Sequence, residues 1–527
     1  MSGAIVTDQF RVSNAENFVN SFDLSTNSYY LFVGLANPAE DYFGRSTSWN
    51  VSTPSPKDDF SNTAHTKDTI IFGKRITSVG LRRLVKKRSW VSGTKYEMYR
   101  DDYNSSNRSP ITNSSRLYDT SYYVITSEFK VYICIDNGSS GDNLTGNPSI
   151  DEPRFTGLEP AAAGSSGDGY LWKYLFTIDP TDVIKFDSTD YIPLPNNWNT
   201  TDNEVLKNIR ENGNSDVNNN QIKKVYIANK GSGYSGSGVC DILGDGTGGK
   251  VQIEINGTGE ITSATITKGG SGYSYGIVDL DPFNESVFSD ANINNHAELI
   301  PIIPPSKGHG YDIYQELGAD KILLYVRFDG STKDFPTTTK FSQIGLIKNP
   351  KKYGVDELFT DSQFNGLHAV RLSTTIQSPI IGEIIEQSYT DNNSNSVKAR
   401  GYVASYDDST RILKYYQDRS LYFADEKTHR DNKENRTIET RGVLPIVSTG
   451  GNISFLSTSQ TSSVDSTLNG STMTVDGSVV DLGVSFTDGI AAPEINKNTG
   501  EILYLDNRPV ISRNTRQKED IKVILEF

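Results

Sequence analysis

The chain has 527 residues and a formal net charge of −14, from 51 basic and 65 acidic residues. This acidic balance makes a nucleic-acid partner unexpected, and no apolar run reaches the roughly 20 residues that span a bilayer. The 28 Tyr and 45 Gly are typical of a β-rich chain, because Tyr favours strands and Gly supplies turns, and the aromatic content excludes disorder. We therefore predict a mainly β fold with a few short helices, in several β-sandwich- or barrel-like domains with α+β elements and β-rich insertions.

Residues 1–205 are predicted to form an N-terminal β-rich core. Strands are expected in NSYYLFVGL from Asn27, in YYVITSEFKVYICI from Tyr122 and in GDGYLWKYLFTI from Gly167, because these runs are rich in aromatic and β-branched residues. The pair Asp179–Pro180 is typical of a helix start, since proline is tolerated at the first helical position.

A basic stretch, RRLVKKRSW, lies inside this block. Leu84, Val85 and Trp90 interrupt its cations, which indicates that the cations flank a strand or a short helix. A solvated face or a protein contact is favoured over nucleic-acid binding. The five cations are Arg82, Arg83, Lys86, Lys87 and Arg88.

Residues 206–290 are predicted to form an inserted module built on a repeat with an offset of 39 residues. KVYIANKGSGYS from Lys224 aligns with SATITKGGSGYS from Ser263, so each unit is a short alternating strand followed by a glycine turn that carries a tyrosine. The glycines supply backbone angles that other residues resist, and the tyrosine can cover a neighbouring strand. The candidate surface residues of this module are Tyr234, Tyr273 and Tyr275.

The motif GDGTGGKV, from Gly244, is one residue short of the phosphate loop of nucleotide-hydrolysing enzymes. That loop needs Ser or Thr after Gly-Lys and then a helix, but here Val251 follows, and Val251, Ile253 and Ile255 alternate with polar residues as in a strand. A connecting turn within the repeat is therefore favoured. GYSYG, from Gly272, matches a nucleophile elbow but also lacks the helix that should follow.

The rest of the chain continues the β pattern. Residues 291–445 are predicted to form a second core region, with a short helix at Tyr311–Leu317 followed by the strand KILLYVRF. Residues 446–495 are expected to be an inserted Ser/Thr-rich region, in which Asp476–Gly477 is the turn pair of a two-residue hairpin. Residues 496–527 are expected to return to the core as C-terminal strands.

No catalytic, cofactor-binding or metal-binding residue can be assigned from the sequence. The five histidines are not paired at metal-ligand spacing, and His309 in GHGYD is interpreted as a structural hydrogen-bonding residue. The loop DNGSSGDN from Asp136 has Asn147 where a calcium loop needs Glu. Cys134 and Cys240 are expected to be buried and reduced. A glycosidase pair among the many carboxylates is neither located nor excluded.

Several strings resemble the baseplate wedge protein of T-even-type contractile-tailed bacteriophages, and most closely its longer counterparts in cyanophages. The strings are long and unusual, and the glycine repeat and the Ser/Thr-rich region lie between them. They are AIVTDQFRVSNAENFV (Ala4 to Val19), SYYLFVGL (from Ser28), KYEMYRDDY (from Lys95), LEPAAAGSSGDGYLWKYLFTIDPTDVIKFDSTDYIPLP (Leu158 to Pro195), GHGYDIYQELGADK (from Gly308), FSQIGLIKNP (from Phe341) and GEILYLDNRPVISRNTRQKEDIKVILEF (from Gly500).

The resemblance implies a structural role, without a cofactor and without enzyme activity. Family members join other wedge proteins into wedges around the tail hub, and the baseplate rearranges on host attachment to trigger sheath contraction. The resemblance also implies a homodimer of mainly β subunits within each wedge, located in the virion at the tail baseplate. The N-terminal sequence has no secretion signal, which agrees with synthesis and assembly in the host cytoplasm.

Candidate contact residues come from the stretches RRLVKKR, MYRDDY and NRPVISR, because Tyr and Arg are favoured anchors of protein interfaces. An alternative function is a receptor- or glycan-binding tail protein, in which exposed tyrosines of the inserted module contact the host surface. An enzyme is a third hypothesis, with GDGTGGKV as its only motif. The candidate interface residues are Arg82, Arg83, Lys86, Lys87, Arg88, Tyr99, Arg100, Arg508 and Arg513.

Overall fold

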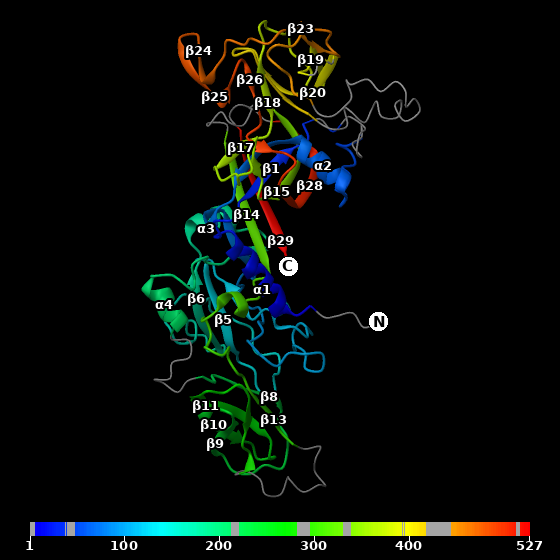
Figure 1. Ribbon diagram of the computed structural model, residues 1–527. Helices are drawn as coiled ribbons and strands as arrows, with labels where there is room; N and C mark the ends of the chain where they lie inside the picture. Colours follow the sequence, from blue (N-terminus) through cyan, green and yellow to red (C-terminus); the bar gives the residue numbers. More distant parts are fainter. Residues whose placement is uncertain are drawn as a thin grey trace, which may run out of the picture. The chain divides into compact units, whose positions relative to one another are not determined.

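The fold is mostly β, with 41% strand and 11% helix, which confirms the predicted fold class (Figure 1). The chain divides into two compact units, each assembled from separate segments. Unit 1 comprises Met1–Phe18, Arg82–Leu323 and Ile524–Phe527, and unit 2 comprises Val19–Leu81 and Leu324–Val523. The computed structural model describes residues 6–36, 38, 48–211, 221–281, 296–329, 339–392, 394, 396–417, 444–512 and 517–527.

The helices are short, and two of them form where the sequence predicts. α3 (Pro180–Phe186) begins at its proline because the carboxylate of Asp179 accepts a hydrogen bond from the N–H of Thr181. α5 (Ile313–Glu316) lies within the predicted helical segment and is capped by Asp312. The other helical elements are α1 (Asp8–Ser21), α2 (Phe60–Thr69), α4 (Glu204–Glu211) and the 3-10 turns η1 (Ser78–Gly80) and η2 (Leu117–Asp119).

An antiparallel three-stranded sheet, β4-β5-β6, forms the centre of unit 1. The run from Tyr122 is a hairpin instead of one strand, because the chain turns at Phe129, where φ is +57°. Nearly every side chain of the middle strand is buried, and the core beside it is rich in aromatic rings. The strands of this region are β3 (Leu81–Lys86), β4 (Tyr123–Ile125), β5 (Lys130–Asn137), β6 (Tyr170–Thr177) and β7 (Tyr191–Pro193).

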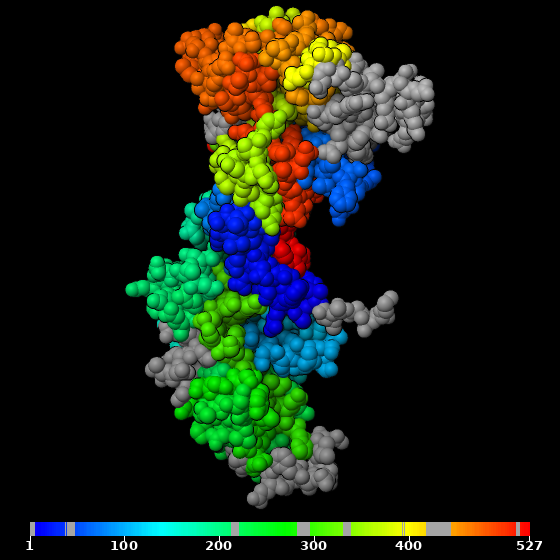
Figure 2. All heavy atoms as spheres, in the orientation of Figure 1, coloured from blue at the N-terminus to red at the C-terminus, as the bar shows by residue number. Residues whose placement is uncertain are grey.

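Six further strands of unit 1 form a Gly/Tyr module, defined as residues 221–281 and 296–303. A four-stranded sheet, β11-β10-β9-β12, packs on the two-stranded sheet β13-β8 around a separate apolar core. The module is the compact green part of Figures 1 and 2. Its strands are β8 (Val225–Asn229), β9 (Gly238–Gly244), β10 (Thr247–Ile255), β11 (Ile261–Ser271), β12 (Gly276–Val278) and β13 (Glu298–Pro301).

The two repeat units have the same backbone geometry. The angle φ is 63° at Gly231 and 62° at Gly270, and it is 87° at Gly233 and 79° at Gly272. Because only glycine adopts such angles without strain, the offset of 39 residues is a structural equivalence. GDGTGGKV connects β9 to β10 in a hairpin, as predicted, and no helix follows it.

The first sheet of unit 2 has the order β17-β2-β1-β15-β28, which places β28 at an edge. Every residue of β1 is buried, and both of its edges are paired, with β2 on one side and β15 on the other. The strands are β1 (Tyr29–Gly34), β2 (Ile70–Arg75), β15 (Lys340–Lys348), β17 (Gln363–Asn365) and β28 (Glu501–Ser512).

A second, seven-stranded sheet of unit 2 has the order β23-β22-β19-β20-β21-β18-β26. Next to it, β24 and β25 form the predicted hairpin, with φ of 48° at Asp476 and 80° at Gly477. The strands are β18 (His368–Arg371), β19 (Ile384–Thr390), β20 (Ser396–Asp407), β21 (Ile412–Tyr416), β22 (Ile453–Phe455), β23 (Thr461–Ser462), β24 (Gly470–Val475), β25 (Ser478–Phe486) and β26 (Ile490–Ala491). The short pair β16 (Lys351–Lys352) and β27 (Ile495–Asn496) also belongs to unit 2, while β14 (Lys321–Asp329) and β29 (Lys518–Glu526) each continue from one unit into the other.

The compact units differ from the consecutive blocks expected from the sequence. Residues 19–81 belong to unit 2, although 1–205 is predicted as one block, because β1 and β2 share a sheet with strands from the C-terminal half. The module also differs from the predicted 206–290. Ile209 of α4 packs into the aromatic core of unit 1, whereas β13, beyond residue 290, completes the module.

His368, the first residue of β18, is held by aromatic neighbours. Its ring stacks on Tyr415 with centroids 5.2 Å apart and an interplanar angle of 19°, and Tyr353 meets it edge-on at 6.5 Å. Burial lowers the pKa of the imidazole from 6.5 to about 3, and the charge of Lys497 acts in the same direction. The folded unit therefore holds His368 in its neutral form.

Unit 2 should lose stability as the pH falls below 6.5. In this range the unfolded chain binds a proton at His368, whereas the folded chain does not bind it until about pH 3. Each pH unit in this window costs at most about 1.4 kcal/mol, or roughly 3 °C in melting temperature. The substitution His368→Phe keeps the ring contacts and removes this titration. Scanning calorimetry should show a smaller fall in melting temperature between pH 7 and pH 5 for this variant than for the wild type, and equal falls would refute the assignment.

Candidate interaction surfaces

The basic stretch at β3 is held by carboxylates of its own unit. Arg82 forms two hydrogen bonds with Asp182 of α3, from Nε to Oδ2 at 2.8 Å and from Nη2 to Oδ1 at 2.9 Å. Lys87 donates from Nζ to Oδ2 of Asp187, just after the same helix, at 2.7 Å. Two ion pairs, one near each end of α3, therefore hold this helix against β3 and the residue that follows it. Both cations are only partly exposed.

The other cations of the stretch are also occupied within unit 1. The guanidinium of Arg83 is buried and lies 3.8 Å from the ring centroid of Tyr314. Arg88 donates to the carbonyl of Tyr118 at 2.8 Å. Lys86 is the one exposed member of the five. The assignment of Arg83 as a contact residue is therefore corrected, and the stretch is not a free cationic surface.

The first three residues of the MYRDDY stretch, Met98 to Arg100, are buried in unit 1, whereas Asp101 is exposed. Arg100 is 2% exposed, donates two hydrogen bonds to Asp102 and lies with its guanidinium carbon 3.9 Å from the ring centroid of Tyr226 in the module. Tyr99 is buried, and its ring meets His309 edge-on at 4.8 Å. Both residues are enclosed by the fold, which corrects their assignment as contact residues and shows that Arg100 links the module to the aromatic core.

A row of ion pairs reinforces this link. Lysines of the module reach carboxylates of the aromatic region, and the backbone N–H of Ile303 donates to Asp101 at 3.2 Å. The three lysine side chains are mostly buried, but only in the Lys224–Asp136 pair is the carboxylate also mostly buried, so this pair is screened less than surface pairs are. The pairs are Lys223 with Glu159, Lys224 with Asp136 and Lys230 with Asp142.

His309 has a structural role, as its sequence context suggests. Its Nδ1 lies 2.5 Å from Oε1 of the buried Glu316, whose other oxygen accepts a hydrogen bond from the N–H of Gly310 at 2.7 Å. The cavity beside this pair measures about 10 Å³, enough for about one water molecule.

A larger cavity, of about 200 Å³, lies beside the first turn of α1. Its lining carries four cations and four carboxylates, most of them paired with one another, so it offers no net charge to a ligand. Among the described residues, no group of three or more His, Cys, Asp or Glu side chains is placed to hold a metal ion. Cys134 and Cys240 are buried and free, as predicted.

In the described part of the chain, no helix is long and apolar enough to cross a bilayer.

Two of the three candidate tyrosines of the module are buried. Tyr273 is 4% exposed, and its hydroxyl donates to the carbonyl of Ile242 at 2.8 Å and accepts from the N–H of Gly249 at 3.0 Å. Tyr234 is equally buried, and its hydroxyl accepts a backbone hydrogen bond at 2.9 Å. The prediction that both lie on the surface is wrong, because each ring belongs to the apolar core of the module and each hydroxyl bonds to backbone groups. Tyr275 is 59% exposed and remains a surface residue.

The exposed apolar residues of the module were not predicted. Val239, Leu243 and Ile277 are each more than half exposed, at 51%, 54% and 65%. The sequence holds a signal for them, because residues 239, 240, 242 and 243 are all apolar. In a strand whose side chains alternate between two faces, such a run must place apolar groups on both faces.

One end of the edge strand β28 is capped by a preceding loop. The indole N–H of Trp49 donates to the carbonyl of Arg508 at 2.6 Å, and Asn50 accepts a hydrogen bond from the N–H of Val510 at 2.9 Å. The side chain of Arg508 is exposed and pairs with Asp506. It therefore remains a candidate contact residue, while Arg513 lies outside the described residues.

The other end of β28 is open. Among the described residues, none outside β15 hydrogen-bonds to the backbone of residues 501–506. Leu503 is 40% exposed in this segment, and no residue of the strand is fully buried. An edge of this kind can accept a strand from another protein.

Replacing Tyr273 by Phe should destabilise the module by about 1–3 kcal/mol, because it leaves a buried carbonyl and a buried N–H without their partner. Tyr275→Phe is the matched control, and it should change stability by less than about 0.5 kcal/mol, because its hydroxyl group is at the surface. Hydrogen exchange measured by mass spectrometry on β10 and β11 reports the module directly. Equal exchange in the two variants would contradict the buried role of Tyr273.

No family model matches the chain, and a search of curated proteins finds no significant match.

Proposed function

We propose that this chain is a structural subunit of the tail baseplate wedge of a contractile-tailed bacteriophage. In this role it is part of the virion and joins other wedge proteins, as a homodimer within each wedge. It takes part in baseplate assembly and in the rearrangement that triggers sheath contraction. The proposal starts from the strings that resemble the wedge protein family and is supported by how those strings meet in space.

The observation that carries the proposal is the pairing of three such strings in unit 2. SYYLFVGL forms β1, FSQIGLIKNP forms β15, and the start of the C-terminal string forms β28, so that segments far apart in the sequence are adjacent strands. Tyr30 lies opposite Ile347, which lies opposite Ile502, and all three contribute to one apolar cluster. The resembling strings therefore specify one shared framework.

The strings of unit 1 also contact one another. Within KYEMYRDDY, the backbone N–H of Tyr96 donates to the hydroxyl of Tyr170 at 2.9 Å, and Tyr170 belongs to the long string that ends at Pro195. The hydroxyl of Tyr314, in GHGYDIYQELGADK, donates to the carbonyl of Pro195 at 2.5 Å. The module and the hairpin β24–β25 lie outside these strings. This division fits a scaffold formed by the resembling strings that carries two added regions.

The open end of β28 is the surface that we assign to a neighbouring wedge protein. It combines unpaired backbone groups with the exposed Leu503, and it lies in the resembling string from Gly500. Backbone hydrogen bonds from a paired strand would supply affinity, and alternate side chains would supply specificity.

The receptor- or glycan-binding alternative has less support. Tyr234 and Tyr273 are buried, so only Tyr275 of the three candidate tyrosines is available to stack on a sugar. Deleting the module distinguishes the two functions. Loss of adsorption by intact particles would favour receptor binding, whereas unassembled tails would favour the structural role.

The substitution Leu503→Lys tests the assembly surface, because it places a charge in the proposed contact without touching the core. Co-expression with the tail proteins encoded beside it should give a complex in sucrose gradients for the wild type. We expect the variant to be recovered at least about tenfold less efficiently, the effect of roughly 1.4 kcal/mol at an interface anchor.

Leu456→Lys is the matched control, because Leu456 is 50% exposed in a turn of the same unit. This variant should assemble like the wild type, and melting temperatures should agree among all three proteins. A wild-type chain that stayed free of every tail protein, and was absent from purified tails, would contradict the proposed function. Equal assembly of both variants would contradict only the assignment of β28.

A further inference from the structure

The solvent-facing side of the module carries an apolar stripe on the edge strand β12 and on its neighbour β9. Val239 and Leu243 of β9 point away from the module core, as do Tyr275 and Ile277 at β12, and Leu243 lies directly opposite Ile277. All four side chains are more than half exposed, at 51%, 54%, 59% and 65% in the order named. A solvated sheet face of an antiparallel sheet is expected to be polar. The stripe therefore departs from the polar composition expected of a solvated face, which indicates that a partner covers it.

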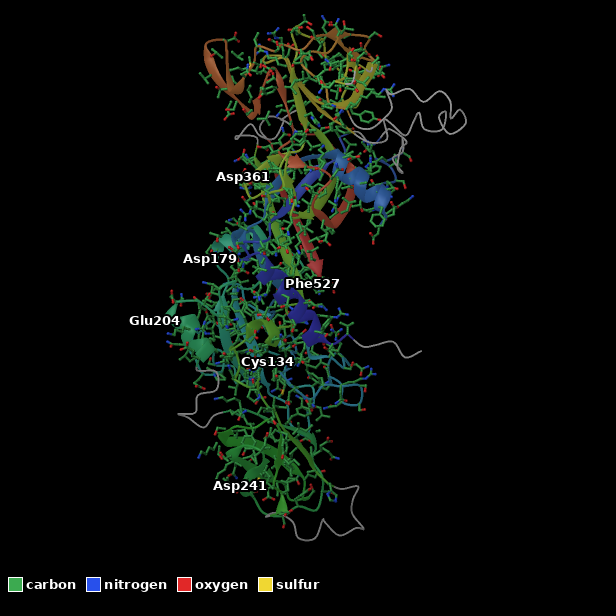
Figure 3. All side chains as sticks on the ribbon, in the orientation of Figure 1. Cys134, Asp179, Glu204, Asp241, Asp361 and Phe527 are labelled. Atoms are coloured by element: carbon green, nitrogen blue, oxygen red, sulfur yellow. The ribbon has the colours of Figure 1, made fainter. Side chains whose placement is uncertain are left out.

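Carboxylates border this apolar stripe. Asp241 lies between Val239 and Leu243 on the same face of β9 and is labelled in Figure 3. Asp279 pairs with it across the strands, its N–H donating to the carbonyl of Asp241 at 2.9 Å. Like charges opposite each other in a sheet are unfavourable. A cationic partner would relieve this arrangement.

A third carboxylate, Asp245, is fixed at the end of the stripe. It accepts hydrogen bonds from the backbone N–H of Ser274 at 2.9 Å and from the hydroxyl of Ser274 at 2.5 Å. On this face Lys250 pairs with Asp241, its Nζ 2.5 Å from the carboxylate, and Lys268 of β11 lies opposite Lys250. Among its described residues, the outer face therefore has these three carboxylates for two ammonium groups, Lys250 and Lys268.

This charge pattern decides between possible occupants. A second copy bound face to face would bring carboxylates against carboxylates, since a two-fold contact pairs a surface with itself. A glycan could donate hydrogen bonds to the carboxylates, but it would cover Val239, Leu243 and Ile277 with hydroxyl groups that find no partner on these side chains. A surface with apolar side chains between lysines or arginines satisfies both features at once.

We propose that the stripe formed by Val239, Leu243, Tyr275 and Ile277, with its acidic border, is a docking surface for another protein that presents apolar side chains flanked by Lys or Arg. The inference goes beyond the proposed function, because it does not require the chain to be a baseplate subunit. The partner binds by covering the apolar stripe, and its cations approach Asp241, Asp245 and Asp279.

The probe for the full-length chain is a fluorescent peptide of alternating Lys and Val. Its length of about ten residues matches the longest strands that are common in globular proteins. Its binding, measured by fluorescence anisotropy, should be at least tenfold tighter than that of an alternating Glu/Val peptide and of an alternating Lys/Ser peptide. The first comparison tests the acidic border, and the second tests the apolar stripe.

The double variant Leu243→Lys with Ile277→Lys should lose this binding. Its matched control is Ile184→Lys with Val205→Lys, because these side chains are exposed on helices of the same unit and the added charge is equal. A second test variant, Asp241→Asn with Asp279→Asn, keeps the apolar stripe and the shape. It should weaken binding several-fold and reduce the dependence on salt.

Five results of the binding assay would overturn the proposal. They are equal binding of the Glu/Val peptide, equal binding of the Lys/Ser peptide, undiminished binding by the double lysine variant, unchanged binding by the double asparagine variant, and loss of binding in the control variant. Sedimentation velocity and a glycan array test the other occupants. Self-association or sugar binding that only the Leu243→Lys, Ile277→Lys variant loses would assign the stripe to a second copy or to a glycan instead. Hydrogen exchange on β10 verifies that each variant keeps the module folded.

Discussion

Unit 2 depends on the complete enclosure of strand β1. All six of its residues are buried, and both of its edges are hydrogen-bonded, to β2 and to β15. Because β15 comes from the other half of the chain, β1 reaches its final environment only when distant segments have joined it. The same requirement brings β28 to the edge of the sheet and leaves part of that edge open. The discontinuous units and the candidate assembly surface are thus consequences of one pairing.

Tyrosine has a structural use throughout the chain that explains its abundance. The rings pack in the apolar cores, while the hydroxyls donate to backbone carbonyls of loops at the core boundary, which satisfies groups that burial would otherwise leave unpaired. Burial raises the pKa of these phenols, so they remain protonated donors. Examples are Tyr30 to Asp361 at 2.7 Å, Tyr122 to Glu316 at 2.6 Å and Tyr123 to Lys86 at 2.7 Å.

The charged groups of the module are paired differently on its two sides. On the side of the aromatic core, Arg100 packs against Tyr226 and lysines of the module pair with carboxylates of the aromatic region. The charged groups on this side of the module therefore have partners within unit 1. On the outer sheet face, apolar side chains lie among carboxylates that lack cations in equal number. The first pattern fixes the module within unit 1, and the second leaves it a surface suited to a basic partner.

Local sequence was enough to predict the β-rich class, the start of α3 at Asp179, the hairpin at Asp476 and the failure of the phosphate-loop motif at Val251. Each of these follows from local rules, namely backbone angles, capping and strand alternation. Long-range contacts, in contrast, place Tyr234, Tyr273, Arg83 and Arg100 in the interior and join residues 19–81 to segments from the C-terminal half. Burial and sheet order depend on which distant segments meet, and composition or spacing within one segment does not carry that information.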